Sequence, residues 1–146
     1  SDFRQPVSQA SRKDMESMPP CDEEAMKWYR LAAEQGLADT QFKLAFGYQT
    51  GRRVLEDHKQ AVKWYHLAAE QGNSLAQLGL GLMYAAGQGV LEDRIQAYAW
   101  LNVAGANGDK DANDTKSKLN LTQDSIEKAR ALSRKMVEEN PKLLGD

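Results

Sequence analysis

Few side chains in this chain combine the types and the spacing that catalysis or metal binding requires. His58 and His66 are its only two histidines, and eight residues of helix would separate them by about 12 Å, too far to bind one metal ion. The adjacent carboxylates Glu56-Asp57 and Glu92-Asp93 could suggest acid–base chemistry. A general acid and a general base need unlike surroundings, however, and a repeated element gives like ones. We therefore expect no enzyme activity, no cofactor and no metal site.

The other candidate groups are equally sparse. The single cysteine, Cys21, excludes an intrachain disulfide, and Met18-Pro19-Pro20 before it lacks the aliphatic and small residues of a lipidation site. Gly87-Gln88-Gly89 falls between predicted helices, whereas a phosphate-binding loop would follow a strand. The net charge of −2 argues against a nucleic-acid partner. No apolar run approaches the roughly 18 residues of a membrane span.

Instead, an internal repeat organises the chain. Trp28, Trp64 and Trp100 are spaced 36 residues apart, and Ala-Ala-Glu-Gln-Gly occurs at 32–36 and at 68–72. Residues 22–57 and 58–93 are identical at 18 of 36 positions. A fixed period of this size is typical of a solenoid, in which each unit buries its apolar face against its neighbours.

Helix signals recur at the same period. Apolar residues of 22–35 follow the i, i+3, i+4, i+7 spacing of a helix, and Gly36 and Gly51 are placed to end this helix and the next one. Helices are likewise predicted over 58–71 and 94–107.

Predicted N-caps also recur, because residues with short acceptor side chains precede most of these helices. They are Asp57, Asn73, Asp93 and Asp109. Glutamine three residues after Asp57 and Asp93 predicts capping boxes, in which the two side chains exchange hydrogen bonds with the backbone. Leu37, at the matching place in the first repeat, cannot cap.

The C-terminal segment departs from the repeat. Thr122 is the predicted N-cap of a helix over about 123–139, with Leu121 and Ile126 placed as a hydrophobic staple. Asn140-Pro141 ends this helix. A solenoid needs a terminal element with one apolar and one polar face, so we interpret this helix as the cap.

The most telling segment is the run Ala-Gln-Leu-Gly-Leu-Gly-Leu-Met-Tyr at 76–84, followed by Gly-Gln-Gly-Val at 87–90, Asp93, Ala97, Trp100 and Gly108. This pattern resembles the Sel1-like repeat of bacterial proteins, a 36-residue relative of the tetratricopeptide repeat. The resemblance covers about residues 22–121. It implies an all-α, right-handed superhelix of antiparallel helix pairs that serves as an adaptor for other proteins. The first repeat departs from the pattern at Thr40, Ala45 and Arg53, where Ala, Gly and Gly are usual.

We therefore expect an N-terminal arm (1–21), three Sel1-like helix pairs (22–57, 58–93 and 94–121), a capping helix (122–140) and a tail (141–146). The three tryptophans are expected to be core residues. Gly79 within a helix costs roughly 1 kcal/mol relative to Ala, which indicates another helix packed too close for a side chain. Tyr48 and Tyr84 are expected to fill space between helices and to form hydrogen bonds through their hydroxyls.

Binding is expected where the repeats differ, on the face of each first helix opposite its buried stripe. This face runs from mixed charge through a basic middle to an apolar end. Its candidate partner-binding residues are Lys27, Arg30, Lys59, Lys63, His66, Ile95, Tyr98 and Asn102. Lys59 and Lys63 form a like-charge pair that structural needs alone would avoid. Two alternatives stay open: a solvated face without a partner, and packing of Ile95 and Tyr98 under the C-terminal helix.

The predicted function is non-catalytic binding of a protein or peptide on the concave face, where first helices lie in related helical repeats. A peptide with an acidic part and an apolar anchor would suit the stripe. The alternative is a structural or self-associating module that assembles through repeat ends or the N-terminal arm, although we favour a monomer. We expect the cell envelope, the periplasm or secretion if a signal peptide has been removed, and otherwise the cytoplasm.

Overall fold

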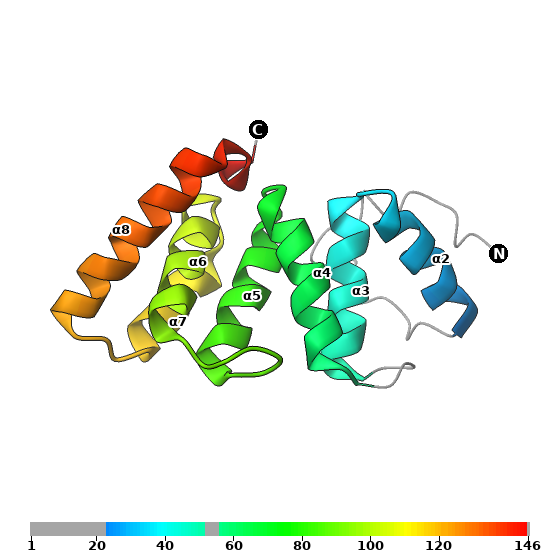
Figure 1. Cartoon of the computed structure of the whole chain (residues 1–146), viewed down its shortest axis with the longest axis horizontal. Coiled ribbons are helices and arrows are strands. Elements are labelled where there is room, and N and C mark those ends of the chain that lie inside the picture. The colour runs from blue at the N-terminus through cyan, green and yellow to red at the C-terminus, as the bar shows by residue number, and fades with distance from the viewer. Residues whose placement is uncertain (1–22, 52–55, 146) are drawn as a thin grey trace.

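The computed structural model describes residues 23–51 and 56–145, which form an all-α fold. These residues hold seven α-helices, one short 3-10 helix and no strand. In chain order they are α2 (Glu23–Glu34), α3 (Ala38–Thr50), α4 (His58–Glu70), α5 (Ser74–Ala86), α6 (Arg94–Ala106), α7 (Lys110–Lys118), α8 (Gln123–Glu139) and η2 (Pro141–Leu144) (Figure 1). The predicted N-terminal arm and Cys21 lie outside the described residues.

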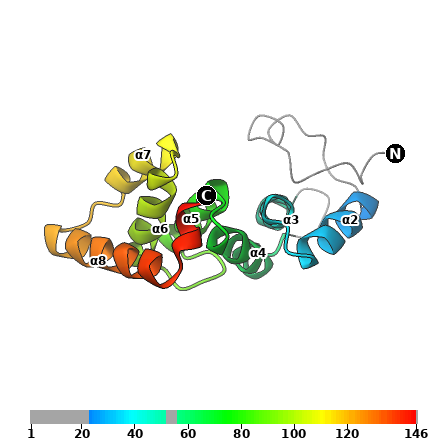
Figure 2. The same ribbon diagram turned by 90° about the horizontal axis from the view of Figure 1, so that it is seen from above.

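Successive helices pack as pairs, α2 with α3, α4 with α5 and α6 with α7. Because α3 also packs on α4 and α5 on α6, the row continues from one pair to the next. Seen from above, α4 and α8 lie along one side of the row and α3 and α7 along the other (Figure 2). The final helix, α8, packs directly on α6. The expected all-α repeat fold is confirmed.

The predicted N-caps are confirmed. In each case the side chain accepts a hydrogen bond from the backbone N–H three residues on, at distances between 2.8 and 3.2 Å. The capping residues are Asp57, Asn73, Asp93, Asp109 and Thr122. Leu37, before α3, makes no such bond. The helix that Thr122 begins has the predicted bounds.

The second half of the predicted capping boxes is wrong. The backbone N–H of Asp57 donates to the Tyr48 carbonyl at 2.9 Å, and that of Asp93 to the Tyr84 carbonyl at 3.0 Å. Each N–H is thus satisfied by the preceding helix, so the glutamine side chain is not needed there. These two bonds fix the start of α4 to α3 and the start of α6 to α5.

Aromatic residues pack between the helices of neighbouring pairs. Trp64 and Trp100 are buried, as predicted, whereas Trp28 in the first repeat is half-buried. Tyr65 is fully buried, and its ring lies against α5. A Cβ atom on Gly79 would be 2.8 Å from that ring. The close approach predicted at Gly79 is therefore confirmed.

Burial of Tyr65 predicts a loss of stability in alkali. Desolvation raises the pKa of its hydroxyl, because the phenolate would lie in the core. In the unfolded chain a tyrosine pKa is about 10, so the folded state holds this proton more tightly. The stability from this group is present below that pH and is lost as the pH rises above it. We expect the urea-derived free energy of unfolding to fall less steeply from about pH 10 upward in Tyr65→Phe than in the parent chain. Equal slopes would contradict this account.

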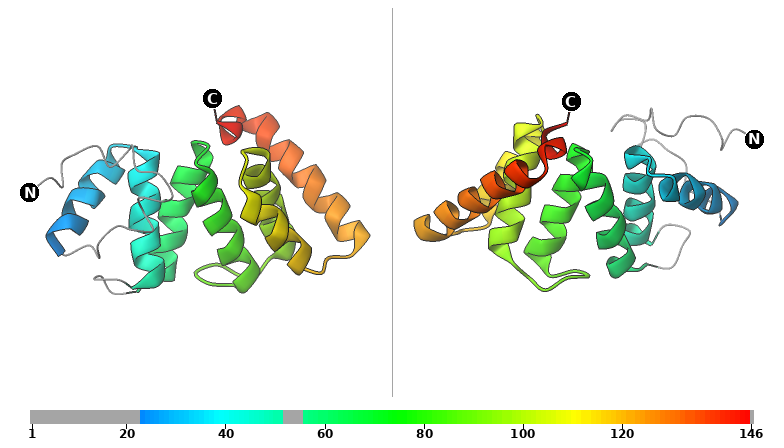
Figure 3. Two further views of the ribbon diagram at one scale, coloured as in Figure 1. Left: turned by 180° about the vertical axis from the view of Figure 1, so that it is seen from behind. Right: turned by 45° about the horizontal axis from the view of Figure 1, so that its top comes forward.

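The chain's last turn returns to the second repeat. η2 packs on α4, α6 and α8, and it lies beside the turn that joins α4 to α5 (Figure 1; Figure 3, right). The Asn140 side chain donates to the Glu70 carbonyl at 2.9 Å. Leu143 is 2% exposed and belongs to the main core cluster. The sequence predicted the end of the helix at Asn140-Pro141 but not this return.

Candidate partner-binding surface

The candidate residues of α2 and α4 lie on an open side of the helix row. It stays open because α2 and α4 pack mainly on α3 and α5 and make few contacts with each other. We call this side the first-helix face and define it by exposed or half-exposed side chains of both helices. They are Lys27, Arg30, Leu31, Glu34, Lys59, Lys63, His66, Leu67 and Glu70.

Lys59 and Lys63 form the basic middle of the first-helix face. Both are exposed and stand one turn apart on α4. Among the ion pairs of the described residues, none includes either lysine. The Lys63 Nζ atom lies 5.0 Å from the centroid of the Trp64 ring, in range of a cation–π interaction. Like charges at this spacing destabilise a helix by a few tenths of a kcal/mol, so helix stability does not account for the pair.

Arg30 and His66 are held by neighbouring side chains. Arg30 donates to the Tyr48 hydroxyl on α3, in line with the predicted role of that tyrosine. The His66 Nδ1 atom lies 2.7 Å from a Glu70 carboxylate oxygen. The His66 ring also meets the edge of Trp100 on α6 at a centroid distance of 5.7 Å. Both residues therefore present a fixed polar surface.

Leu31 and Leu67 are the residues of this face that the sequence did not predict. They are 52% and 39% exposed, although their identity between repeats is typical of buried scaffold positions. Helical spacing carried the signal: Leu31 stands four residues after Lys27 and falls on the same polar side of α2. Val103, the matching residue in the third repeat, is only 2% exposed. The two leucines thus lie open where the third position is covered.

Val103 is covered by α8 and the tail, because it belongs to one core cluster with Leu143, against which Met136 and Val137 pack. Ile95 and Tyr98 of α6 pack in one apolar cluster with Leu119, Ile126 and Ala129. Ala99, on the same predicted stripe, is fully buried. The apolar end of the stripe is therefore enclosed in the structure, as in the alternative of packing under the C-terminal helix. A role of Ile95 and Tyr98 in partner binding stays a prediction.

Lys116 of α7 closes over Tyr98 from the other side. Its Nζ atom lies 5.3 Å from the centroid of the Tyr98 ring and donates to the Asn102 side-chain oxygen at 2.8 Å. Burial lowers the pKa of this lysine, and repulsion from Arg130 lowers it further. Lys116 therefore serves as a local cover for the ring.

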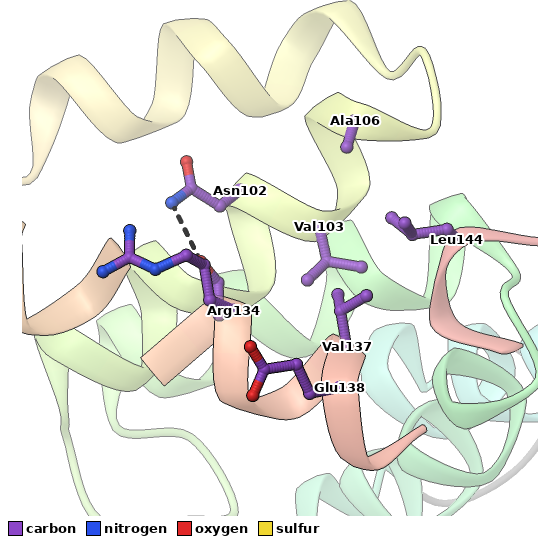
Figure 4. Close-up of a pocket in the computed structure, with 8 residues that line it drawn as sticks. Asn102, Val103, Ala106, Arg134, Val137, Glu138 and Leu144 are labelled. Atoms are coloured by element: carbon purple, nitrogen blue, oxygen red, sulfur yellow. Dashed lines mark hydrogen bonds between the residues drawn. The ribbon is translucent and has the colours of Figure 1, made fainter. Parts of the chain in front are cut away.

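Asn102 also forms one wall of an open groove between α6, α8 and the tail (Figure 4). It donates to the Ser133 hydroxyl at 3.3 Å. The groove has a volume of about 420 Å³, with an apolar side formed by valines and a leucine and charged groups at its rim. Its lining residues are Asn102, Val103, Ala106, Ser133, Arg134, Val137, Glu138 and Leu144. The space would accept one or two apolar side chains of a peptide.

Within residues 23–51 and 56–145, no group of three or more His, Cys, Asp or Glu side chains is arranged to hold a metal ion. None of the helices described is both long enough and apolar enough to cross a membrane.

Comparison with known families matches the Sel1 repeat to residues 22–37, 38–73 and 74–109. The two full-length matched units, 38–73 and 74–109, begin at the second helices α3 and α5, and the match at 22–37 covers α2 alone. The predicted units began at first helices, so the same period is divided at different points. A search of curated proteins finds no match.

Thirteen solved chains are similar to this one, among them the following two. One is a protective antigen present in uropathogenic Escherichia coli strains that displays an SLR fold, with a TM-score of 0.77 and 34% identity over 83% of this chain. The chain spans only 27% of the length of that antigen. The other is a Sel1 repeat protein from Oxalobacter formigenes, with a TM-score of 0.63 and 39% identity over 67% of this chain and 74% of that one.

Proposed function

Because this chain belongs to the Sel1 repeat family, we propose that it is a non-catalytic adaptor that binds a protein or peptide along the first-helix face. Members of the family are generally protein-interaction scaffolds. By analogy with related helical repeats, this face is the concave one. The observation that carries the proposal is the pair Leu31 and Leu67, exposed at matching positions beside the cationic side chains of Lys27 and Lys63.

Binding energy would come chiefly from the two leucines. Full burial of a leucine side chain contributes about 1.5–3 kcal/mol relative to exposure, and both residues have a large exposed fraction left to bury. Apolar anchors at the centre of an interface supply most of its affinity, whereas charges at the rim act on encounter and orientation. We thus propose that the leucines supply most of the binding energy and that the lysines speed and orient the encounter with the partner.

The charge of the face selects the partner's chemistry. Lys27, Lys59 and Lys63 are exposed cations, whereas the His66 ring already has Glu70 beside it. A segment with acidic residues next to one or two apolar side chains would match both parts of the face. This segment is the proposed ligand class.

Reversing the charge of the basic middle tests the proposal. In Lys59→Glu/Lys63→Glu we expect the association rate with a partner, isolated by affinity capture on the full chain, to fall about tenfold at low salt. The loss should shrink as salt is added, because the lost term is long-range attraction. Stopped-flow or biolayer interferometry measurements would give the association rates of the variant and of the parent chain at low and at high salt.

The matched control is Lys110→Glu/Lys118→Glu, which makes the same change in net charge on exposed positions of α7. We expect this variant to bind nearly as the parent chain does. Equal losses in the two double variants would mean that only net charge matters. An unchanged rate in Lys59→Glu/Lys63→Glu would contradict the proposed face.

A further inference from the structure

The chain's own tail, residues 140–145, occupies a binding site at the junction of the second and third repeats, which we call the tail site. The side-chain amides of Gln77 and Asn107 both donate to the Leu143 carbonyl, each at 2.8 Å. The Leu143 side chain is 2% exposed in the core. The tail site therefore binds one backbone carbonyl through two side-chain amides and buries one leucine side chain.

The tail site also depends on the absence of a side chain at position 72. A Cβ atom on Gly72, in the turn between α4 and α5, would lie 2.5 Å from the Lys142 carbonyl oxygen and 2.9 Å from Gly145. The tail backbone thus runs where any side chain at position 72 would stand. Asn140 fixes the start of the segment on the Glu70 carbonyl.

The repeat places the same groups 36 residues earlier, at the junction of the first and second repeats. Gly36, Gln41 and Gln71 stand at the positions of Gly72, Gln77 and Asn107. The only change of type, asparagine to glutamine, keeps the side-chain amide. We call this set the first junction.

The buried glutamines of both junctions adopt one arrangement. Gln77 donates to the Ala69 carbonyl at 3.0 Å, and Gln41 donates to the Ala33 carbonyl at 3.0 Å. Each glutamine is therefore anchored on the end of the preceding helix by one of its two N–H groups.

The amides that complete each junction also match. Asn107 donates to the Gln77 side-chain oxygen at 2.8 Å, and Gln71 donates to that of Gln41 at 2.8 Å. Gln71 has a further, longer bond of 3.3 Å to the Leu67 carbonyl. The two amides thus make the same bond to the buried glutamine, but Asn107 gives its second N–H to the Leu143 carbonyl and Gln71 gives its second N–H to the Leu67 carbonyl.

The two junctions differ in whether another segment of the chain contacts them. Gln77 gives its second N–H to the tail, whereas Gln41, 3% exposed, has no second acceptor among the described residues. Among the residues that the structure describes, a Cβ atom on Gly36 would meet nothing within 4 Å, whereas a Cβ atom on Gly72 would meet the tail. A buried donor without an acceptor destabilises the folded state, and an incoming carbonyl would satisfy it.

The geometry points to the first junction as a second peptide site, which takes a partner segment with the chemistry of residues 140–145: an Asn-Pro turn followed by two leucines and a glycine. The leucine carbonyl would accept from the second N–H of Gln41, and from Gln71 if Gln71 gives up its longer bond to the Leu67 carbonyl. The leucine side chain would enter between the repeats. A second copy's tail is not favoured, because Leu143 is already buried in its own chain. The site uses neither Lys59 nor Lys63, so it and the proposed function can fail separately.

The probe is the fluorescein-labelled peptide Asn-Pro-Lys-Leu-Leu-Gly with its C-terminus amidated, titrated against the full chain by fluorescence anisotropy. We expect one peptide per chain, and no binding of a version with aspartate in place of the first leucine. Gly36→Asn should weaken binding at least tenfold, because its side chain fills the path of the peptide while asparagine tolerates the left-handed backbone. Gln41→Met, which keeps volume but removes the donors, should do the same.

Gly108→Asn is the matched control, since Gly108 has a similar φ of 92° against 93° and equally open surroundings. This variant should bind the peptide as the parent does. Failure of the parent chain to bind, or equal binding by Gly36→Asn, would overturn the proposal. Concentration-dependent dimerisation abolished by Leu143→Ala would also overturn it, by making a second copy the occupant.

Discussion

Replacing Leu143 with alanine is expected to lower the free energy of unfolding by about 2–5 kcal/mol. The side chain is 2% exposed and belongs to the core cluster that includes Ala69 and Ala76. Its removal leaves a cavity between two repeats, and it loosens the backbone carbonyl that Gln77 and Asn107 share. Urea denaturation followed by circular dichroism would measure the loss.

The adjacent leucine supplies the control. Leu144 is 46% exposed at the edge of the groove between α6 and α8, so Leu144→Ala should cost less than about 1 kcal/mol. If the two variants lose equal stability, Leu143 does not hold the tail in the way described.

A second large effect is expected at Gly89, in the loop between α5 and α6. Its φ of 74° disfavours any side chain, and an added Cβ atom would lie 2.4 Å from the His58 carbonyl oxygen. That oxygen belongs to the backbone of α4 and cannot turn aside. Gly89→Ala should therefore lower the free energy of unfolding by about 2–4 kcal/mol, the sum of backbone strain and displacement of the loop.

Gly108→Ala separates the two causes. Gly108 also has a positive φ, 92°, but a Cβ atom there would meet nothing within 4 Å. This variant should lose only about 1 kcal/mol, from backbone strain. A loss at Gly108 as large as that at Gly89 would show that contact with α4 is unimportant. Thermal melts of both variants in one buffer decide the matter.

The local features of the fold could be predicted because they depend on residues a few positions apart. Asp57 caps α4 through an N–H three residues away, and the period of the tryptophans gives the register of the pairs. The hydrogen-bond acceptor of the Asp57 N–H could not be predicted, because this acceptor, the Tyr48 carbonyl, belongs to the preceding helix. The repeat of Tyr48 and Asp57 at Tyr84 and Asp93 does not by itself say which backbone groups are joined.

The candidate surface was predictable in part for the same reason. The polar side of α2 and α4 follows from helical spacing, and it includes Lys27, Lys59 and Lys63. The sequence left open whether Ile95 and Tyr98 line the binding stripe or pack under the C-terminal helix, because that choice depends on tertiary packing, which encloses Tyr98. Leu31 illustrates the opposite error, since identity between repeats is no evidence of burial.

The return of the tail also determines how the domain comes apart. When each unit of a solenoid contacts only its neighbours, either end can fray independently. Here Asn140 reaches back 70 positions to Glu70, and the Leu143 carbonyl is held by Gln77 across 66 positions. The contacts of η2 with α4, α6 and α8 close α4, α5, α6 and α8 into one ring, while α2 and α3 stand outside it. We therefore expect the helices of this ring to unfold together. Unfolding is thus expected to begin at the N-terminal pair and to reach the other helices later. Residues 140–145, at the opposite end of the domain, determine this order.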